Sequence, residues 1–136
     1  MMLQFDDALE AKQLNQMIAI FKQYKVKHIV DAAGIRLALE RVDIVPSELA
    51  LMQAANESAW GTSRFARIGL NFFGQWCYKK GCGMVPKNRN TGANHEVAAY
   101  KSVRAAVNAY FYNINTNRAY KSLRDIRAQQ RQLQQT

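Results

Sequence analysis

Long hydrophobic runs are absent from this sequence. Among its 136 residues no apolar segment approaches the roughly 18 that a membrane-spanning helix needs. Glycine and proline are also few, with seven and two residues, and their scatter excludes collagen-like and low-complexity chains. The composition, 49% hydrophobic and 21% charged, suits one compact domain and leaves too few residues for two. We therefore expect a single domain over residues 1–128.

An export signal is also missing from the beginning of the chain. Residues 1–7 read MMLQFDD and contain neither a basic stretch nor an apolar stretch of the signal-peptide type. The N-terminal residues therefore leave the compartment open.

Carboxylates are scarce in the middle of the chain. Nineteen basic and ten acidic residues give a formal net charge of +9. Between residues 49 and 124 there are eleven basic residues and only two carboxylates, Glu57 and Glu96. Such a segment attracts an anionic partner, for example nucleic acid, anionic lipid or an acidic glycan. A basic surface kept for solubility is the alternative.

Apolar residues recur at the spacing of a buried helix face in four segments, which indicates a mainly α fold. A further helix is predicted from Pro46, which suits a first helical turn, to just before Gly61. Ser102 is the expected N-cap of the segment that begins at Val103. The four apolar faces are Leu14, Met17, Ile18 and Phe21; Val26, Ile29, Val30, Ala33 and Leu37; Val103, Val107, Tyr110, Phe111 and Ile114; and Tyr120, Leu123 and Ile126.

Two segments lack helical periodicity. Residues 69–96 hold five of the seven glycines, which predicts an irregular lobe with short strands and a hairpin closing on residues 96–100. Residues 129–136 hold five glutamines, which predicts a disordered or weakly helical tail. The expected fold class is therefore mainly α (α+β), with a helical domain and a small β lobe.

The two cysteines and two histidines limit the metal chemistry that is available. A zinc site would need Cys77 and Cys82 to converge with both His28 and His95, so we expect no metal. Two alternatives remain for the cysteines: a local disulfide, which would suit an oxidising compartment, or two half-buried thiols.

Glu57 is the strongest candidate for acid catalysis. The predicted helix places it near a C-terminus, where the negative end of the helix dipole favours a protonated carboxyl group. The neighbouring Trp60 and Phe65 would also partly desolvate it. A protonated carboxyl group is what a general acid needs. An ordinary glutamate on a wet helix face is the alternative.

A long signature occupies the middle of the chain. It reads QAANESAWGTSRFA over residues 53–66 and GLNFFG over residues 69–74. It continues with WC at 76–77, GCG at 81–83, HEVAAY at 95–100 and NRAY at 117–120. These segments resemble the peptidoglycan endo-β-N-acetylglucosaminidases of glycoside hydrolase family 73, particularly the Bax-like subgroup. The resemblance covers about residues 44–124, well over half of the chain.

The resemblance implies a lysozyme-like helical domain with a small β-hairpin lobe. The implied activity is hydrolysis of the β-1,4 bond after N-acetylglucosamine in peptidoglycan, with no metal or organic cofactor. The implied partner is the peptidoglycan strand, not nucleic acid, and the implied location is periplasmic or secreted. We assume a monomer.

The resemblance also assigns catalytic roles. Glu57 matches the general acid of the family. Glu96 is the only carboxylate between Glu57 and Asp125, so it is either the base that activates water or a structural group, in which case the acetamido oxygen of the substrate is the nucleophile. Tyr120 matches a family tyrosine that lies near the N-acetyl group.

A second set of residues is expected to bind substrate or to shape its groove. Aromatic side chains bind the apolar faces of sugar rings, although Phe72 and Tyr110 are expected in the core. Arg64 is expected mainly to anchor the loop after the catalytic helix. The expected substrate-binding residues are Trp60, Arg64, Asn71, Phe73 and Trp76.

The sequence departs from the usual family motif Gly-Asn-Asn-Leu-Phe-Gly at two positions. Leu70 stands in place of the first Asn, and Phe72 stands in place of the Leu. The Leu70 change removes an amide that could hold the loop, whereas Phe72 is a change of volume that a core can absorb.

Three other functions are compatible with parts of the sequence. A wall-binding scaffold could keep the fold without turnover. A muramidase or lytic transglycosylase would have a similar fold, and a transglycosylase needs only one acid. A basic nucleic-acid-binding protein would fit the charge but gives the aromatic lobe no role.

Overall fold

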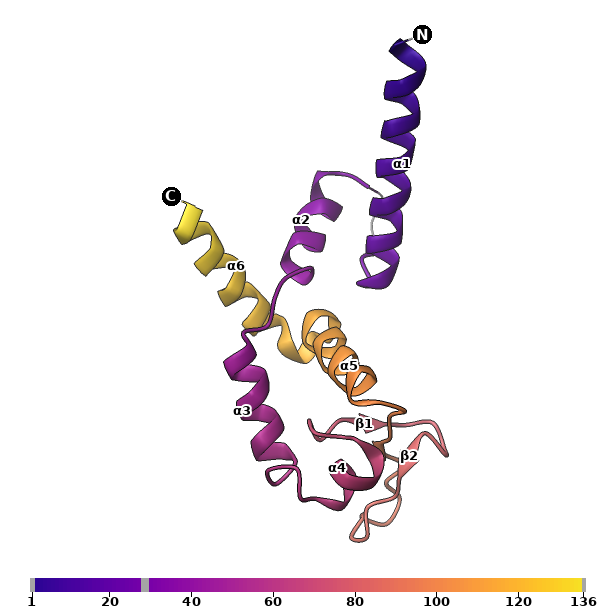
Figure 1. The fold of residues 1–136 in the computed structure, drawn as a ribbon, viewed down its shortest axis with the longest axis vertical. Helices are drawn as coiled ribbons and strands as arrows, with labels where there is room; N and C mark the ends of the chain where they lie inside the picture. Colours follow the sequence, from indigo (N-terminus) through magenta and orange to yellow (C-terminus); the bar gives the residue numbers. More distant parts are fainter. Residues whose placement is uncertain (1, 28–29, 136) are drawn as a thin grey trace. The chain divides into compact units, whose positions relative to one another are not determined.

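A computed structural model of the chain describes residues 2–27 and 30–135, with side chains from residue 10 onward. His28 and Ile29, which the sequence analysis used, lie outside the described residues. The described part is 59% helical, with six α-helices and a three-stranded antiparallel sheet, which confirms the mainly α (α+β) class (Figure 1). None of its helices combines the length and apolar character needed to cross a membrane.

The elements follow one another in the order helices, sheet, helices. The bounds are α1 Met2–Gln23, α2 Ala32–Arg41, α3 Ser47–Glu57, α4 Arg64–Gly69, β1 Trp76–Cys77, β2 Gly83–Met84, β3 Glu96–Ala98, α5 Val103–Thr116, a 3-10 turn Arg118–Tyr120 and α6 Lys121–Gln135. They form two compact units, of which the first comprises Met1–Ile44 with Tyr112–Thr136 and the second Val45–Phe111.

The apolar core of the first unit lies between α1 and α2. Phe21, Val26 and Ala38 are buried there. The predicted α1 face is only partly buried, because Leu14 is 47% exposed and Ile18 is 50% exposed. The second predicted apolar face began at Val26, but α2 starts only at Ala32. Asp31 caps this helix by accepting a 2.7 Å hydrogen bond from the Gly34 N–H.

Arginine side chains attach α6 to the rest of the first unit. Arg124 is buried and donates to the carbonyls of Ile114 and Asn117, both at 2.8 Å. Arg127 donates to the carbonyl of Glu40 at 2.8 Å, and its Nε lies 3.3 Å from Asp43 Oδ2, an ion pair without hydrogen-bond alignment.

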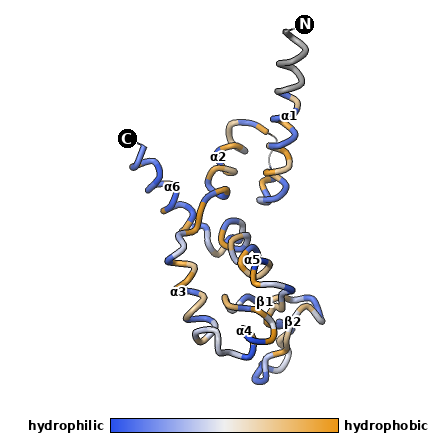
Figure 2. The backbone as a smooth tube through the Cα atoms, in the orientation of Figure 1, coloured by the Kyte–Doolittle hydropathy of each residue, from blue (hydrophilic) through white to orange (hydrophobic). Residues whose placement is uncertain are grey.

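The glutamine-rich segment is helical up to Gln135 rather than disordered. Figure 2 shows that α6 is largely hydrophilic, so burial of an apolar face does not explain its helical form. Glutamine and arginine are good helix formers, and Arg131 is fixed by a 2.9 Å ion pair to Asp43 and a 2.8 Å hydrogen bond to the carbonyl of Leu39. Thr136 lies outside the described residues.

The second unit contains α3, α4, the sheet and most of α5. The strand order is β1-β3-β2, so the predicted hairpin is one half of a sheet in which β3 is central. Trp76 faces Val97 in one pair, and Gly83 faces Ala98 in the other. Ser102 caps α5 as predicted, by accepting a 3.1 Å hydrogen bond from the Ala105 N–H.

Gly83 allows the close approach of β2 to β3. A Cβ atom at this position would lie 2.0 Å from the carbonyl oxygen of Val97, which is backbone and cannot move aside. At Gly69 the nearest atom to an added Cβ is the flexible sulfur of Met84, at 3.2 Å. The two glycines therefore form a matched pair for a test of sheet packing.

We predict that Gly83→Ala lowers the free energy of unfolding by about 3 kcal/mol, because overpacking forces the strands apart. Gly69→Ala, at the end of α4, should change it by less than about 1 kcal/mol. Urea denaturation followed by circular dichroism measures both. Equal effects of the two substitutions would contradict the close approach described for β2 and β3.

Candidate active site

Glu57 lies at the C-terminal end of α3, which stops at this residue and not just before Gly61 as predicted. The helix begins at Ser47 directly after Pro46, and Ser58 ends it with its N–H bonded to the carbonyl of Ala54 at 3.1 Å. The expectation that Glu57 is partly desolvated is wrong, because its side chain is exposed. The carboxylate at the end of α3 is therefore accessible to a ligand from solvent.

A left-handed turn follows Glu57 and exposes Trp60. Ala59, Trp60 and Gly61 have φ values of 51°, 57° and 79°. Only glycine adopts this conformation without strain, so Ala59 and Trp60 each carry about 1 kcal/mol. The turn projects Trp60, whose side chain is 79% exposed. Strained backbone of this kind is common at functional sites.

Ser58 locks the left-handed turn in place. Its side chain is 2% exposed, and its hydroxyl donates to the carbonyl of Ala54 while accepting a 2.8 Å hydrogen bond from the Gly61 N–H. Its carbonyl accepts a 3.0 Å hydrogen bond from the Ser63 N–H. One buried residue thus joins the end of α3 to the beginning of α4.

Arg64 contacts the segment after β2, whereas its expected role of anchoring the loop after the catalytic helix stays a prediction. It follows Ser63, the N-cap of α4, and its Nη2 donates to the carbonyl of Val85 at 3.2 Å. Its guanidinium lies over the ring of Phe65 with 5.3 Å to the centroid.

Asn71 organises the loop between α4 and β1 from within. It is 2% exposed, and its side-chain nitrogen donates to the carbonyls of Gln75 and Ala98, both at 2.9 Å. Its side-chain oxygen accepts from the N–H groups of Phe73 at 3.3 Å and Gln75 at 3.2 Å. The amide therefore has no free donor for a ligand, and its geometry is that of a structural residue rather than the expected substrate-binding one.

The loop held by Asn71 reaches the carboxylate of Glu57. Gly74 has a φ of 62°, and a Cβ atom on it would lie 2.8 Å from Glu57 Oε2. Phe73 stacks on Tyr110 of α5 with 3.9 Å between ring centroids, and the Tyr110 hydroxyl donates to Gln53, one helical turn before Glu57. The stack and the hydrogen bond thus fix α3, α5 and the loop around one carboxylate.

Leu70 occupies a left-handed position at the end of α4. Its φ is 51°, and its N–H bonds to the carbonyl of Phe65. Asparagine and glycine are the residues that favour this conformation at a helix end, and the family motif has Asn here. The substitution therefore adds backbone strain to the loop, besides the loss of the amide.

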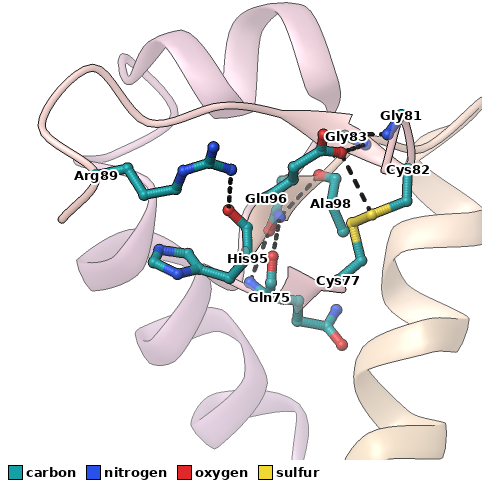
Figure 3. Close-up of a disulfide and its surroundings, with 10 residues drawn as sticks. Gln75, Cys77, Gly81, Cys82, Gly83, Arg89, His95, Glu96 and Ala98 are labelled. Atoms are coloured by element: carbon teal, nitrogen blue, oxygen red, sulfur yellow. Dashed lines mark hydrogen bonds between the residues drawn. A yellow bond between two sulfur atoms is a disulfide. The ribbon is translucent and has the colours of Figure 1, made fainter. Parts of the chain in front are cut away.

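Trp76, which is exposed, stacks on the half-buried His95 in the β lobe. Their rings are 4.0 Å apart and inclined by 15°, and Trp76 is 57% exposed. Arg89 supports the pair by donating to the carbonyl of His95 at 3.2 Å (Figure 3). Trp76 therefore has exposed surface against which a sugar ring can stack.

Cys77 and Cys82 form a disulfide that closes a short loop over Glu96. The sequence left the state of these cysteines open. Glu96 is 6% exposed and accepts hydrogen bonds from the Gly81 N–H at 3.1 Å and the Gly83 N–H at 3.0 Å (Figure 3). The Cys82 sulfur lies 3.5 Å from the same carboxylate but carries no proton in a disulfide.

These contacts hold Glu96 in its ionised form. The hydrogen bond from the Gly81 N–H lowers the pKa of Glu96, the N–H groups of Gly83 and Cys82 and the charge of Arg89 act in the same direction, and burial opposes them. Although Cys77, Cys82 and Glu96 have donor atoms within 4.8 Å of one another, the disulfide and the backbone occupy these atoms. The cluster therefore offers no cation site.

Tyr120 ends the 3-10 turn that precedes α6 and belongs to the first unit, whereas Glu57 and Glu96 belong to the second. Its ring is half-buried. Asn117 caps the turn by accepting a 3.0 Å hydrogen bond from the Ala119 N–H. A catalytic role of Tyr120 stays a prediction.

Three residues that shape the surroundings of Glu57 were not predicted from the sequence. They are Gln53, which bonds Tyr110, Ser58, which locks the turn, and Gly74, which leaves room for the carboxylate. Gln53 and Glu57 are four residues apart and so share one helix face, which is a signal the sequence contains. The roles of Ser58 and Gly74 depend on contacts that spacing alone does not reveal.

Comparisons with known proteins agree with the resemblance. Residues 32–136 match the family Glucosaminidase, described as mannosyl-glycoprotein endo-beta-N-acetylglucosaminidase. The chain is 42% identical over 118 residues to Protein bax of Escherichia coli (strain K12). Those residues make up 85% of this chain and 41% of that protein, so the chain spans about two fifths of the length of this relative. No solved structure matches the chain.

We predict that Ala59→Gly raises the free energy of unfolding by about 0.5–1 kcal/mol, because glycine removes the left-handed strain next to Glu57. Ala55→Gly, inside α3, should lower it by about 1 kcal/mol. Thermal denaturation of both variants measures the difference. Destabilisation by both substitutions would show that residue 59 is not left-handed.

We predict that Glu96→Gln destabilises the protein at neutral pH and that the difference from the wild type shrinks in acid. A lowered folded pKa gives a stabilisation that is complete above the ordinary glutamate value of about 4.3. It is lost as the pH falls through the folded value.

Urea denaturation between about pH 7 and pH 3 measures this difference. Glu48→Gln, in the exposed first turn of α3, is the control and should lower the free energy of unfolding at neutral pH by no more than about 1 kcal/mol, the usual value for a carboxylate near a helix N-terminus. A constant gap between wild type and Glu96→Gln would show that Glu96 is not held as an ion.

Proposed function

Because the chain belongs to the glucosaminidase family, described as mannosyl-glycoprotein endo-beta-N-acetylglucosaminidase, we propose that it is a glycosidase that cleaves peptidoglycan. The bond cleaved is the β-1,4 linkage that follows N-acetylglucosamine. The observation that carries this proposal is the exposed carboxylate of Glu57 at the end of α3, enclosed on one side by Gly74. The carboxylate lies within the residues that match the family.

Glu57 acts as the general acid in this mechanism. It donates its proton to the glycosidic oxygen while the bond from that oxygen to C1 breaks, so the leaving sugar departs as a neutral alcohol. The loop around Gly74 limits the directions from which a glycosidic oxygen can approach. Asn71 and the Phe73–Tyr110 stack hold that loop, which keeps the approach fixed.

Glu96 supports the lobe and does not act as the base. A base must reach a water molecule and accept its proton, whereas Glu96 is buried and hydrogen-bonded to Gly81 and Gly83. The pKa of Glu96 is also lowered, which makes it a weaker base. We therefore assign the nucleophile to the acetamido oxygen of the substrate. That oxygen attacks C1 as the glycosidic bond breaks, and water later opens the resulting ring.

Aromatic residues supply the binding surface for the sugar rings. Trp60 and Trp76 are 79% and 57% exposed, so both rings are accessible to the apolar face of a sugar. Phe73 is half-buried and stacked on Tyr110, so it presents only part of its ring. Tyr120 is assigned to the N-acetyl group, on the resemblance alone.

The substrate places the protein in the bacterial cell envelope, outside the cytoplasm. The Cys77–Cys82 disulfide supports this location, because such bonds persist in oxidising compartments. The chain spans about two fifths of the length of Protein bax, so its activity, substrate and partners are all part of this proposal.

Product analysis with Glu57→Gln tests the proposal. Purified peptidoglycan is digested, reduced with sodium borohydride and analysed by mass spectrometry. Wild type and the control Glu48→Gln should give fragments that end in reduced N-acetylglucosamine. Glu57→Gln should release at least about 100-fold less, because general acid catalysis contributes that much. Circular dichroism verifies that each variant is folded.

Other products would contradict the proposal in distinct ways. Reduced muramic ends would indicate a muramidase, and anhydro-muramic ends a lytic transglycosylase. A folded wild type that binds the wall without releasing fragments would be a scaffold. Glu96→Gln should keep its activity within about tenfold of the wild type, and a loss as large as that of Glu57→Gln would make Glu96 the second catalytic carboxylate.

A further inference from the structure

The Cys77–Cys82 loop, residues 77–82, presents positive charge that no carboxylate neutralises. Lys79 and Lys80 are exposed, and Tyr78 beside them is 65% exposed. Among the side chains described from residue 10 onward, the ion pairs involve Asp43 and Asp125, and neither lysine takes part in one. The two cations are therefore available to an external anion.

Among the described side chains, Glu96 forms no ion pair with either lysine. Glu96 lies beneath the loop with its oxygens bonded to the N–H groups of Gly81 and Gly83 (Figure 3). The second unit, Val45–Phe111, has only Glu48 and Glu57 as further acids. Its cations are Arg64, Arg67, Lys79, Lys80, Lys87, Arg89, Lys101 and Arg104.

The loop is held in one shape before any ligand arrives. The disulfide closes it, and the Cys82 N–H bonds to the carbonyl of Lys79 at 3.0 Å to form its turn. Strands β1 and β2, which flank it, both pair with β3. Because less conformational entropy is lost when a rigid loop binds, its exposed side chains are suited to recognition rather than to solubility alone.

We propose that the Cys77–Cys82 loop binds the carboxylates of peptidoglycan through Lys79 and Lys80. The proposal rests on the proposed function for the choice of polymer. Chains of N-acetylated sugars are uncharged, so carboxylates on the lactyl groups and peptides distinguish peptidoglycan from other β-1,4-linked N-acetylhexosamine polymers. Two cations on a rigid loop, next to the exposed ring of Tyr78, match such a substrate.

A binding assay with Glu57→Gln as the parent protein separates this proposal from catalysis, since it needs no turnover. The probe is purified peptidoglycan freed of phosphodiester-linked polymers. The same peptidoglycan with its carboxylates amidated by carbodiimide and methylamine is the uncharged comparison. Pelleting at about 20 mM and about 300 mM salt shows how far binding is electrostatic.

Lys79→Gln with Lys80→Gln should weaken binding to the untreated polymer about three- to tenfold at low salt. It should not change binding to the amidated polymer or binding at high salt. The matched control is Lys12→Gln with Lys22→Gln, which removes two exposed charges from α1 and should bind like the parent.

Four results would overturn the proposal. The loop variant could bind like the parent, the α1 control could lose as much affinity, or the loss could persist on the amidated polymer. Tighter, loop-dependent retention of duplex DNA than of peptidoglycan would also overturn it and assign the surface to nucleic acid. If Glu57→Gln proves active in the product assay, the proposed general acid fails while the binding comparison remains valid.

Discussion

The surroundings of Glu57 depend on the buried side-chain amide of Asn71. This amide bonds four backbone groups, and it connects the turn that carries Phe73 to β3 through the carbonyl of Ala98. Together with the stack of Phe73 on Tyr110, these bonds hold Gly74 against the carboxylate. A single polar residue in the interior thus sets the position of the wall of the candidate site, while α3 sets the position of the acid.

Features that rest on local sequence could be predicted. Proline at a first turn gave the start of α3 within a residue, Ser102 gave the start of α5, and the glycine-rich composition of residues 69–96 indicated the small β lobe. The signature around Glu57 gave the family, which the comparisons confirm. Each of these signals acts over a few neighbouring residues.

Features without a local sequence signal could not be predicted. Two of the three residues in the left-handed turn after Glu57 are not glycine, so the sequence did not indicate this turn. The strand order of the sheet could not be predicted, because strands of two or three residues are too short to show a pattern in the sequence. The helical form of the glutamine-rich end follows from arginines that reach Asp43, about 90 positions earlier in the chain.

The attachment of α6 by guanidinium groups has a thermal consequence. Hydrophobic packing strengthens on warming from the cold and gives unfolding its positive heat capacity, whereas exposing polar groups lowers that heat capacity. The contacts of Arg124, Arg127 and Arg131 are of the second kind. Release of α6 should therefore add little to the heat-capacity change of unfolding. The free energy that holds α6 in place should vary less with temperature than the free energy of packing Phe21 in the core of the same unit.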